Sequence, residues 1–187
     1  MNDILPTLLE HLERGESLVQ ATILTHEGST PRSAGSRMLL RAEGGGVRIA
    51  AGTVGGGLAE AQVMAAGAEV LATGQRRVET FDLTGELAAG ADMICGGRLR
   101  VFLERLESGD LPLLLNLEEA LDQGRRCLRL TPLAAGSSAL LTPGEGCLGA
   151  ELPEELVRAA RFAGAHISAP VVFEHAGRSY ALEPWVA

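Results

Sequence analysis

The feature that most constrains the fold is an order of elements that occurs twice along the chain. In each half the hydrophobic pattern predicts a helix ended by glycine, a strand, a hairpin, a glycine-containing loop, a second helix and two further strands. Two stretches also match in residue type, G96-G-R-L-R-V-F-L-E104 and A176-G-R-S-Y-A-L-E183. Such short matches indicate a degenerate internal repeat. We therefore predict an α/β fold of mixed sheet and helices in layers, with residues 1–107 and 108–187 as two halves of one domain and no Rossmann domain.

The two halves differ where function is expected. The first half is longer, and its extra residues fall in the loop from Gly28 to Arg32 and in the loop before Cys95. A scaffold needs neither insertion, and binding or catalytic sites are usually built on loops. We therefore expect the first half to carry the site. We expect the second half, where His175 stands roughly in the place of Cys95, to be structural.

Composition excludes several classes of protein. Hydrophobic residues make up 46% of the chain, enough for a core, whereas aromatic residues make up only 3% and the net charge is −8. All sixteen basic residues are arginines spread along the chain, so a nucleic-acid partner is not expected. No apolar run approaches the ~20 residues of a membrane span, and the N-terminus lacks the basic start of a signal peptide. The three cysteines fit neither a disulfide framework nor a zinc spacing, so we expect a cytoplasmic protein with reduced thiols and no membrane partner.

The segment G52-T-V-G-G-G57 is the first candidate binding element, because it runs directly into a predicted helix from Leu58 to Thr73. Glycines let the backbone approach a ligand, and the unpaired N–H groups at a helix start carry partial positive charge. This combination favours a phosphate or another anion. The alternative is an ordinary strand-to-helix turn, since the spacing is neither the dinucleotide fingerprint nor the P-loop.

A second glycine cluster contains a thiol, D92-M-I-C-G-G97. The neighbouring glycines would leave the sulfur of Cys95 open to a ligand, and a thiolate can contact a soft metal or relay sulfur. The alternative is that Cys95 is a small buried hydrophobic residue, which is common for a free cysteine. Cys127 is expected in the core, and Cys147 in a loop or in the core.

Three separated motifs, taken together and in this order, resemble the N-terminal domain of the XdhC/CoxI family. They are G28-S-T-P-R32 with A34-G-S-R-M38, G52-T-V-G-G-G57 with Glu60, and M93-I-C-G-G97 running into V101-F-L-E104. The resemblance implies an accessory protein, or chaperone, of molybdenum hydroxylases such as xanthine dehydrogenase and carbon monoxide dehydrogenase. Family members bind the molybdenum cofactor (molybdopterin, with or without a nucleotide), protect it during sulfuration and help insert it into the apo-enzyme. A cysteine desulfurase as sulfur donor and a homodimeric state are also implied.

The resemblance further implies a set of site residues in this chain. The expected cofactor-binding residues are Ser29, Thr30, Arg32, Thr53, Gly55, Gly56, Gly57, Glu60, Cys95, Gly96 and Gly97. Cys95 is in addition the candidate molybdenum contact and the candidate catalytic thiol. Arg32 suits a phosphate through paired N–H donors, with a salt bridge to a carboxylate as the alternative. Glu60 either binds the pterin edge or stabilises the helix end by its charge.

The chain departs from the family pattern in two respects. Longer members continue into a Rossmann-type domain, which is not expected here, so a separate chain would supply it where it is needed. Leu58 stands where some members carry a cysteine, so a two-thiol mechanism is not supported. Two other functions stay open, a thiol-dependent enzyme or sulfur carrier that uses Cys95, and a nucleotide- or phosphate-binding module.

Overall fold

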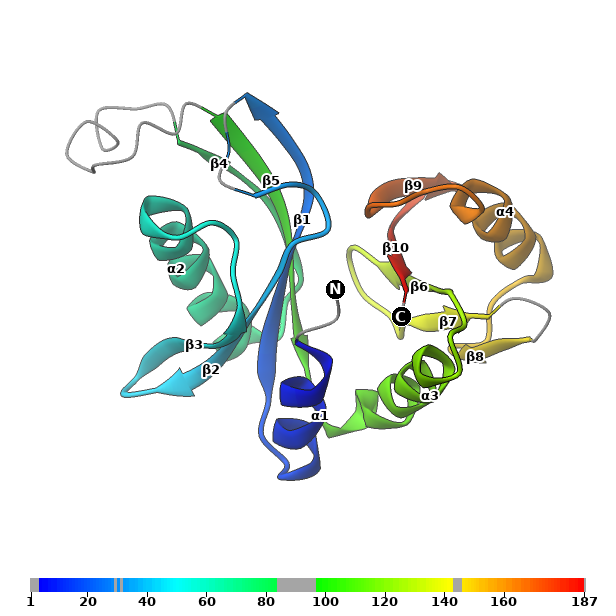
Figure 1. Cartoon of the computed structure of the whole chain (residues 1–187), viewed down its shortest axis with the longest axis horizontal. Coiled ribbons are helices and arrows are strands. Elements are labelled where there is room, and N and C mark those ends of the chain that lie inside the picture. The colour runs from blue at the N-terminus through cyan, green and yellow to red at the C-terminus, as the bar shows by residue number, and fades with distance from the viewer. Residues whose placement is uncertain (1–3, 29, 31, 84–96, 143–145, 187) are drawn as a thin grey trace.

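A computed structural model of the chain describes residues 4–28, 30, 32–83, 97–142 and 146–186. Over these residues the chain forms two five-stranded sheets and four α-helices (Figure 1). The α/β fold class and the repeat-like layout expected from the sequence are confirmed. Every strand pairing among the described residues is antiparallel, so this part of the chain contains no Rossmann unit, which is built on parallel strands.

The first sheet is built from the elements of the first half. They are α1 (Leu5–Glu13), β1 (Leu18–Gly28), β2 (Arg37–Glu43), β3 (Gly46–Gly52), α2 (Gly57–Thr73), β4 (Arg77–Asp82) and β5 (Gly97–Leu106). The strands lie in the order β3-β2-β1-β5-β4. α2 ends at Gly74, whose φ of 70° is the left-handed conformation that glycine adopts at a helix C-terminus.

The second sheet repeats this arrangement. Its elements are η2 (Ser108–Asp110), α3 (Leu111–Asp122), β6 (Cys127–Pro132), β7 (Ala139–Leu141), β8 (Cys147–Gly149), α4 (Glu154–Gly164), β9 (Val171–His175) and β10 (Arg178–Trp185). The strand order β8-β7-β6-β10-β9 is that of the first sheet, element for element. Cys147, expected in a loop or in the core, lies in the edge strand Cys147–Gly149, which pairs with β7, and it packs against a core cluster.

Two glycines show how closely the halves correspond. Gly52 ends β3 and Gly149 ends β8, and both have positive φ, of 73° and 90°. A Cβ atom at Gly52 would collide with the carbonyl oxygen of Arg37, and one at Gly149 would lie 2.7 Å from that of Ser138. Arg37 and Ser138 precede equivalent residues of β2 and β7, so the same close approach of backbone to backbone occurs at the same place in each sheet.

The layers follow from the alternation of side chains along the strands. One face of the first sheet packs on α2, and one face of the second sheet packs on α4. The other two faces meet each other, so that the order of layers is α2, first sheet, second sheet, α4 (Figure 1). α1 and α3 pack together against one edge of this interface, around Leu18, Leu106 and Trp185.

Part of the extra length of the first half falls in the two loops expected from the sequence, and part in longer elements such as β1 and α2. Residues 83–96 connect β4 with β5, whereas residues 176–177 suffice between the equivalent strands β9 and β10. Residues 29–36 connect β1 with β2, a longer connection than residues 133–138 between β6 and β7. Among the described helices, none has the length and apolar character needed to cross a membrane.

Candidate functional site

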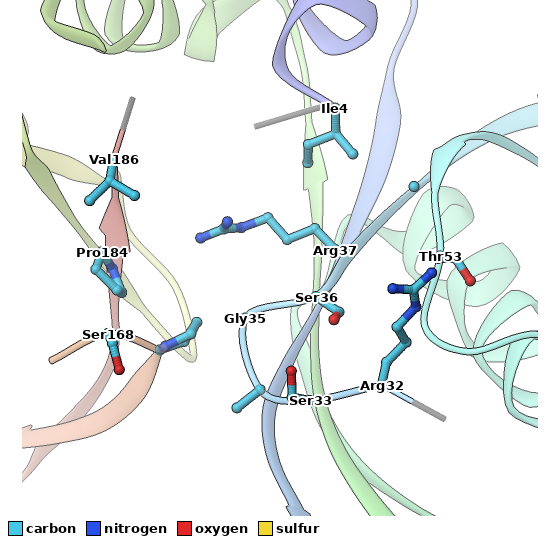
Figure 2. A pocket seen from close by; sticks show the side chains of 13 residues that line it. Ile4, Arg32, Ser33, Gly35, Ser36, Arg37, Thr53, Ser168, Pro184 and Val186 are labelled. Carbon is cyan, nitrogen blue, oxygen red and sulfur yellow. The ribbon is translucent and has the colours of Figure 1, made fainter. Parts of the chain in front are cut away.

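A cavity of about 370 Å³ lies where the first half meets the second half. We call it the inter-half cavity; it is lined by Ile4, Arg32, Ser33, Ala34, Gly35, Ser36, Arg37, Gly52, Thr53, Ser168, Pro170, Pro184 and Val186. Figure 2 shows the loop before β2 forming its floor, with Pro184 and Val186 of the second half facing Arg37. A cavity of this volume suits a small organic ligand. The cavity therefore brings together residues of the first two motifs, which flank the β2–β3 hairpin, and residues of the second half.

The glycine loop connects β3 with α2, and Gly52 and Thr53 at its start line the cavity. Gly55, Gly56 and Gly57 all have positive φ, of 130°, 80° and 54°. Gly56 is the residue that precedes the helix, and no side chain caps the N–H groups of the first turn. A Cβ atom at Gly56 or Gly57 would meet nothing within 4 Å, so these glycines are required by the backbone conformation and leave space above the helix end. This geometry is that of an anion-binding loop.

Thr53 and Glu60 hold the glycine loop in place. The Thr53 hydroxyl accepts a hydrogen bond from the N–H of Gly55 at 3.0 Å and donates one to the carboxylate of Glu60. Glu60 lies in the first turn of α2, where a negative charge is stabilised by the helix dipole. Its carboxylate is thus engaged within the loop, and the role of Glu60 in binding a pterin stays a prediction.

The loop that carries Thr30 and Arg32 is fixed by its own hydrogen bonds. The Thr30 hydroxyl donates to the carbonyl of Arg32 at 2.9 Å, and the N–H of Ala34 donates to Nδ1 of His26 at 3.3 Å. Arg32 lines the cavity, and its side chain extends toward Thr53 (Figure 2). With the described residues Arg32 forms no ion pair, so its guanidinium is open to a ligand.

Of the third motif the structure describes Gly97 onward. Gly28, the last residue of β1, pairs with Gly97, the first residue of β5. These two ends of the first and third motifs are therefore neighbours in the sheet. Ser29, Cys95 and Gly96 lie outside the described residues, so their predicted roles stay predictions.

The described thiols are not exposed candidates for chemistry. Cys127 is buried in the core between α1 and α3, as expected. Cys147 is half-buried in β8, and burial raises the pKa of its thiol despite the nearby charge of Arg161. Among the described residues, no group of three or more His, Cys, Asp or Glu side chains is placed to hold a metal.

Arg37 is a cavity residue that the site prediction missed. Its side chain is 8% exposed, and its guanidinium carbon lies 3.9 Å from the ring centroid of Trp185. Its Nε lies 3.6 Å from the Glu183 carboxylate, which is an ion pair but too long for a hydrogen bond. Nε and Nη2 are buried and have no hydrogen-bond partner among the described residues. The signal available in the sequence was the arginine at the start of an otherwise apolar strand, M38-L-L40.

Behind Arg37, a buried ionic network crosses the interface between the sheets. Arg129 binds both oxygens of Glu104, at 2.5 and 3.1 Å, and lies 3.4 Å from Glu183. Arg76 lies 3.7 Å from Glu104. Each half thus sends one buried carboxylate to an arginine of the other half, Glu104 to Arg129 and Glu183 to Arg37. The matching glutamates of the two repeat sequences are the centre of this network.

Burial and charge act on this network in opposite directions. Burial raises the pKa of Glu104, and the charge of Arg129 only partly offsets that effect. Burial also opposes the charge of Arg129, but Glu104 and Glu183 outweigh it, so that the pKa of Arg129 is raised. For Arg37 the balance is reversed. Burial lowers the pKa of Arg37 more than the attraction of Glu183 raises it. Of Arg37 and Arg129, Arg37 is therefore the cation whose burial is less compensated by neighbouring carboxylates.

Comparisons with known proteins agree with the motifs. The sequence model of the XdhC and CoxI family matches residues 11–82, the segment that carries the first two motifs. The fold resembles the crystal structure of a xanthine dehydrogenase from Bacillus halodurans, with a TM-score of 0.72 and 22% sequence identity. That similarity covers 96% of this chain and 52% of the other, so the chain spans about half the length of that protein. A search of the curated proteins gave no match. The resemblance inferred from the motifs is therefore confirmed, and over residues 11–82 the family that this chain resembles is the XdhC and CoxI family.

Proposed function

We propose that the protein binds the molybdenum cofactor and serves as an accessory protein of a xanthine dehydrogenase- or carbon monoxide dehydrogenase-type hydroxylase. The family match over residues 11–82 supports the accessory role. The observation that carries the binding proposal is the inter-half cavity, at which the Arg32 loop and the glycine loop meet. Both loops come from the longer first half, as expected for a site grafted on a repeated scaffold.

The described residues fit the chemistry of this cofactor, which is a pterin with a dithiolene and a phosphate. A phosphate requires N–H donors and close approach of the backbone, and the positive-φ glycines before α2 provide both. Arg32 provides a guanidinium without a carboxylate partner among the described residues. Thr30, Thr53 and Gly97 complete the described part of the proposed site, to which Ser29, Cys95 and Gly96 are added from the motifs. When bound, the cofactor supplies a molybdenum centre with soft, sulfur-containing ligands, toward which a thiolate at Cys95 is chemically suited.

The wider role is part of the same proposal. The apo-hydroxylase would receive the cofactor, a cysteine desulfurase would supply sulfur, and a separate Rossmann-domain chain would complete the protein where such a domain is needed. We place this activity in the cytoplasm and in a homodimer. Residues 1–107 would form the half that carries the motifs, and residues 108–187 the half that supports it.

The test is the retention of purified molybdenum cofactor during anaerobic gel filtration, followed by molybdenum analysis. Gly56→Asp places a carboxylate at the helix start and is expected to abolish retention; Cys95→Ala is expected to reduce it. Gly45→Asp is the matched control, because Gly45 has a φ of 82°, close to the 80° of Gly56, and both positions have open space around Cβ. Gly45 lies in the turn between β2 and β3, outside the cavity.

The outcomes separate the candidate functions. Retention by wild type and by Gly45→Asp, with loss in Gly56→Asp, supports the proposed site. Retention that is unchanged in Cys95→Ala would favour a plain phosphate-binding module. A wild-type protein that retains no molybdenum would refute the proposal that this chain carries the cofactor.

A further inference from the structure

The inter-half cavity has a positive lining in an acidic protein. The chain has a net charge of −8. The described residues that line the cavity nevertheless include two arginines, Arg32 and Arg37, and no aspartate or glutamate. Three serines and Thr53 add hydroxyl groups to the lining. Such a lining attracts an anion and offers it hydrogen-bond donors.

Arg37 is the arginine of this lining that is buried with donors unsatisfied. A guanidinium presents five N–H donors, and a buried donor without a partner costs about 1–3 kcal/mol. Nε and Nη2 of Arg37 are buried donors of this kind. The aromatic ring of Trp185 holds the guanidinium by stacking, and the Glu183 carboxylate attracts it from 3.6 Å. The side chain is thus fixed in position while its donors are unsatisfied.

The buried ionic network behind the cavity has one more positive charge than negative charges, which favours the binding of one anion. The ion-paired network contains three guanidinium groups, of Arg37, Arg76 and Arg129, and two carboxylates, of Glu104 and Glu183. Glu104 is engaged by the two-pronged contact with Arg129, and Glu183 is shared between Arg129 and Arg37. One positive charge is in excess, and Arg37 is the member of the network that lines the cavity.

We infer that the inter-half cavity binds a phosphorylated organic ligand through Arg37, so that the second half of the chain takes part in ligand binding. Figure 2 shows the Arg37 side chain reaching across the cavity toward the second half, while Arg32 extends to the opposite side. The serine hydroxyls can donate to the phosphate, and an apolar wall suits the body of the ligand. That wall consists of Ile4, Pro170, Pro184 and Val186. The site rests on this geometry; the identity of the ligand as the molybdenum cofactor rests on the proposed function.

The test uses pyrophosphate as the probe and the fluorescence of Trp185 as the readout. Trp185 is the single tryptophan of the chain and is stacked under Arg37, so an anion that binds Arg37 changes its environment. Loss of a hydrogen bond to a charged group corresponds to roughly a tenfold to hundredfold rise in Kd, which is the expected effect of Arg37→Gln. Arg37→Lys, which keeps the charge, is expected to recover part of the affinity.

The matched control is Arg48→Gln, which changes the net charge equally at an exposed position of β3 outside the cavity. It is expected to bind pyrophosphate as wild type does. If Arg37→Gln does not fold, Arg32→Gln on the exposed loop tests the same cavity and is expected to weaken binding in the same direction. Equal affinity of Arg48→Gln and a folded cavity variant would overturn the inference, as would the absence of saturable binding by wild type.

The two proposals fail separately. Retention of molybdenum cofactor with undiminished affinity in Arg37→Gln would refute the Arg37 site and leave the accessory function standing. Saturable pyrophosphate binding that depends on Arg37, in a protein that retains no molybdenum cofactor, would refute the proposed function and leave the Arg37 site standing.

Discussion

Removal of the Arg129 side chain is the sharpest test of how the two sheets are held together. Arg129 is 1% exposed and Glu104 is wholly buried, with two N–O contacts of 2.5 and 3.1 Å between them. In Arg129→Met, Glu104 would keep only Arg76, 3.7 Å away, and Glu183 would keep only Arg37, 3.6 Å away. Breaking a buried pair by removing one partner costs about 3–5 kcal/mol, because an uncompensated charge stays in the interior.

That magnitude is a large part of the total stability of a domain, which is about 5–15 kcal/mol. The free energy of unfolding is measured by urea denaturation, followed by far-ultraviolet circular dichroism and by the fluorescence of buried Trp185. Arg14→Met is the matched control. Arg14 forms an exposed ion pair with Glu10 at 2.9 Å in α1, and an exposed pair contributes less than about 1 kcal/mol.

A double variant distinguishes lost charge compensation from lost packing. Replacing both members of a buried pair by apolar side chains is often neutral, so Arg129→Met with Glu104→Leu is expected to be more stable than Arg129→Met alone. An Arg129→Met protein no less stable than Arg14→Met would refute the reasoning. So would a double variant as unstable as the sum of its two single changes.

Two further predictions concern packing and acid stability. Gly67 of α2 lies so close to Leu40 that an added Cβ would overlap the Leu40 side chain. Gly67→Ala is therefore expected to lower the free energy of unfolding by about 1–3 kcal/mol, measured by thermal unfolding. The loss is expected to be smaller in a Leu40→Ala background. The pKa of the Glu16 carboxyl is lowered by its hydrogen bond from His11 and by the charge of Arg14. A lowered pKa in the folded state means that Glu16 stabilises the fold above its unfolded pKa, and that this contribution is lost as the pH falls through the folded value. The stability difference between wild type and Glu16→Gln should therefore be present at neutral pH and vanish in acid; a difference independent of pH would contradict the assignment.

Local signals in the sequence predicted most of the scaffold. The helix predicted over Leu58 to Thr73 is α2, and it ends at Gly74 in the left-handed conformation. Leu99, Val101 and Leu103 alternate with Arg98 and Arg100, a period of two that is typical of a strand with one buried face, as β5 has. Both features depend on residues that are close together in the chain, so they can be predicted from the sequence.

The buried charges could not be predicted in the same way. Glu104 and Glu183 were recognised as matching residues of a repeat, but the sequence does not state that the two strands face each other. Arg129 lies between the apolar residues Leu128 and Leu130, and its partner Glu104 belongs to the other sheet. The β8 strand was missed for a different reason, since Cys147–Gly149 is too short to show an alternation.

The candidate site was predicted only in part, because some of its residues meet only in the folded chain. The sequence predicted the glycine loop and the Arg32 loop because each is a local motif. It did not predict the cavity, which is lined by residues of both halves. Arg37 was not predicted as a site residue, because its contacts are with Trp185 and Glu183 of the second half.

The order of strands within each sheet has a consequence for how fast the chain reaches its native state. β5 pairs with β1, and β10 pairs with β6, so in both sheets a central partner is the last strand of that sheet to be synthesised. Pairing between distant segments costs loop-closure entropy before the stabilising contacts form. Proteins with many such pairings therefore fold slowly. During translation β6 can pair with β7, but it lacks its second neighbour until β10 has emerged from the ribosome. The second sheet is therefore expected to be completed only after synthesis of Arg178–Trp185.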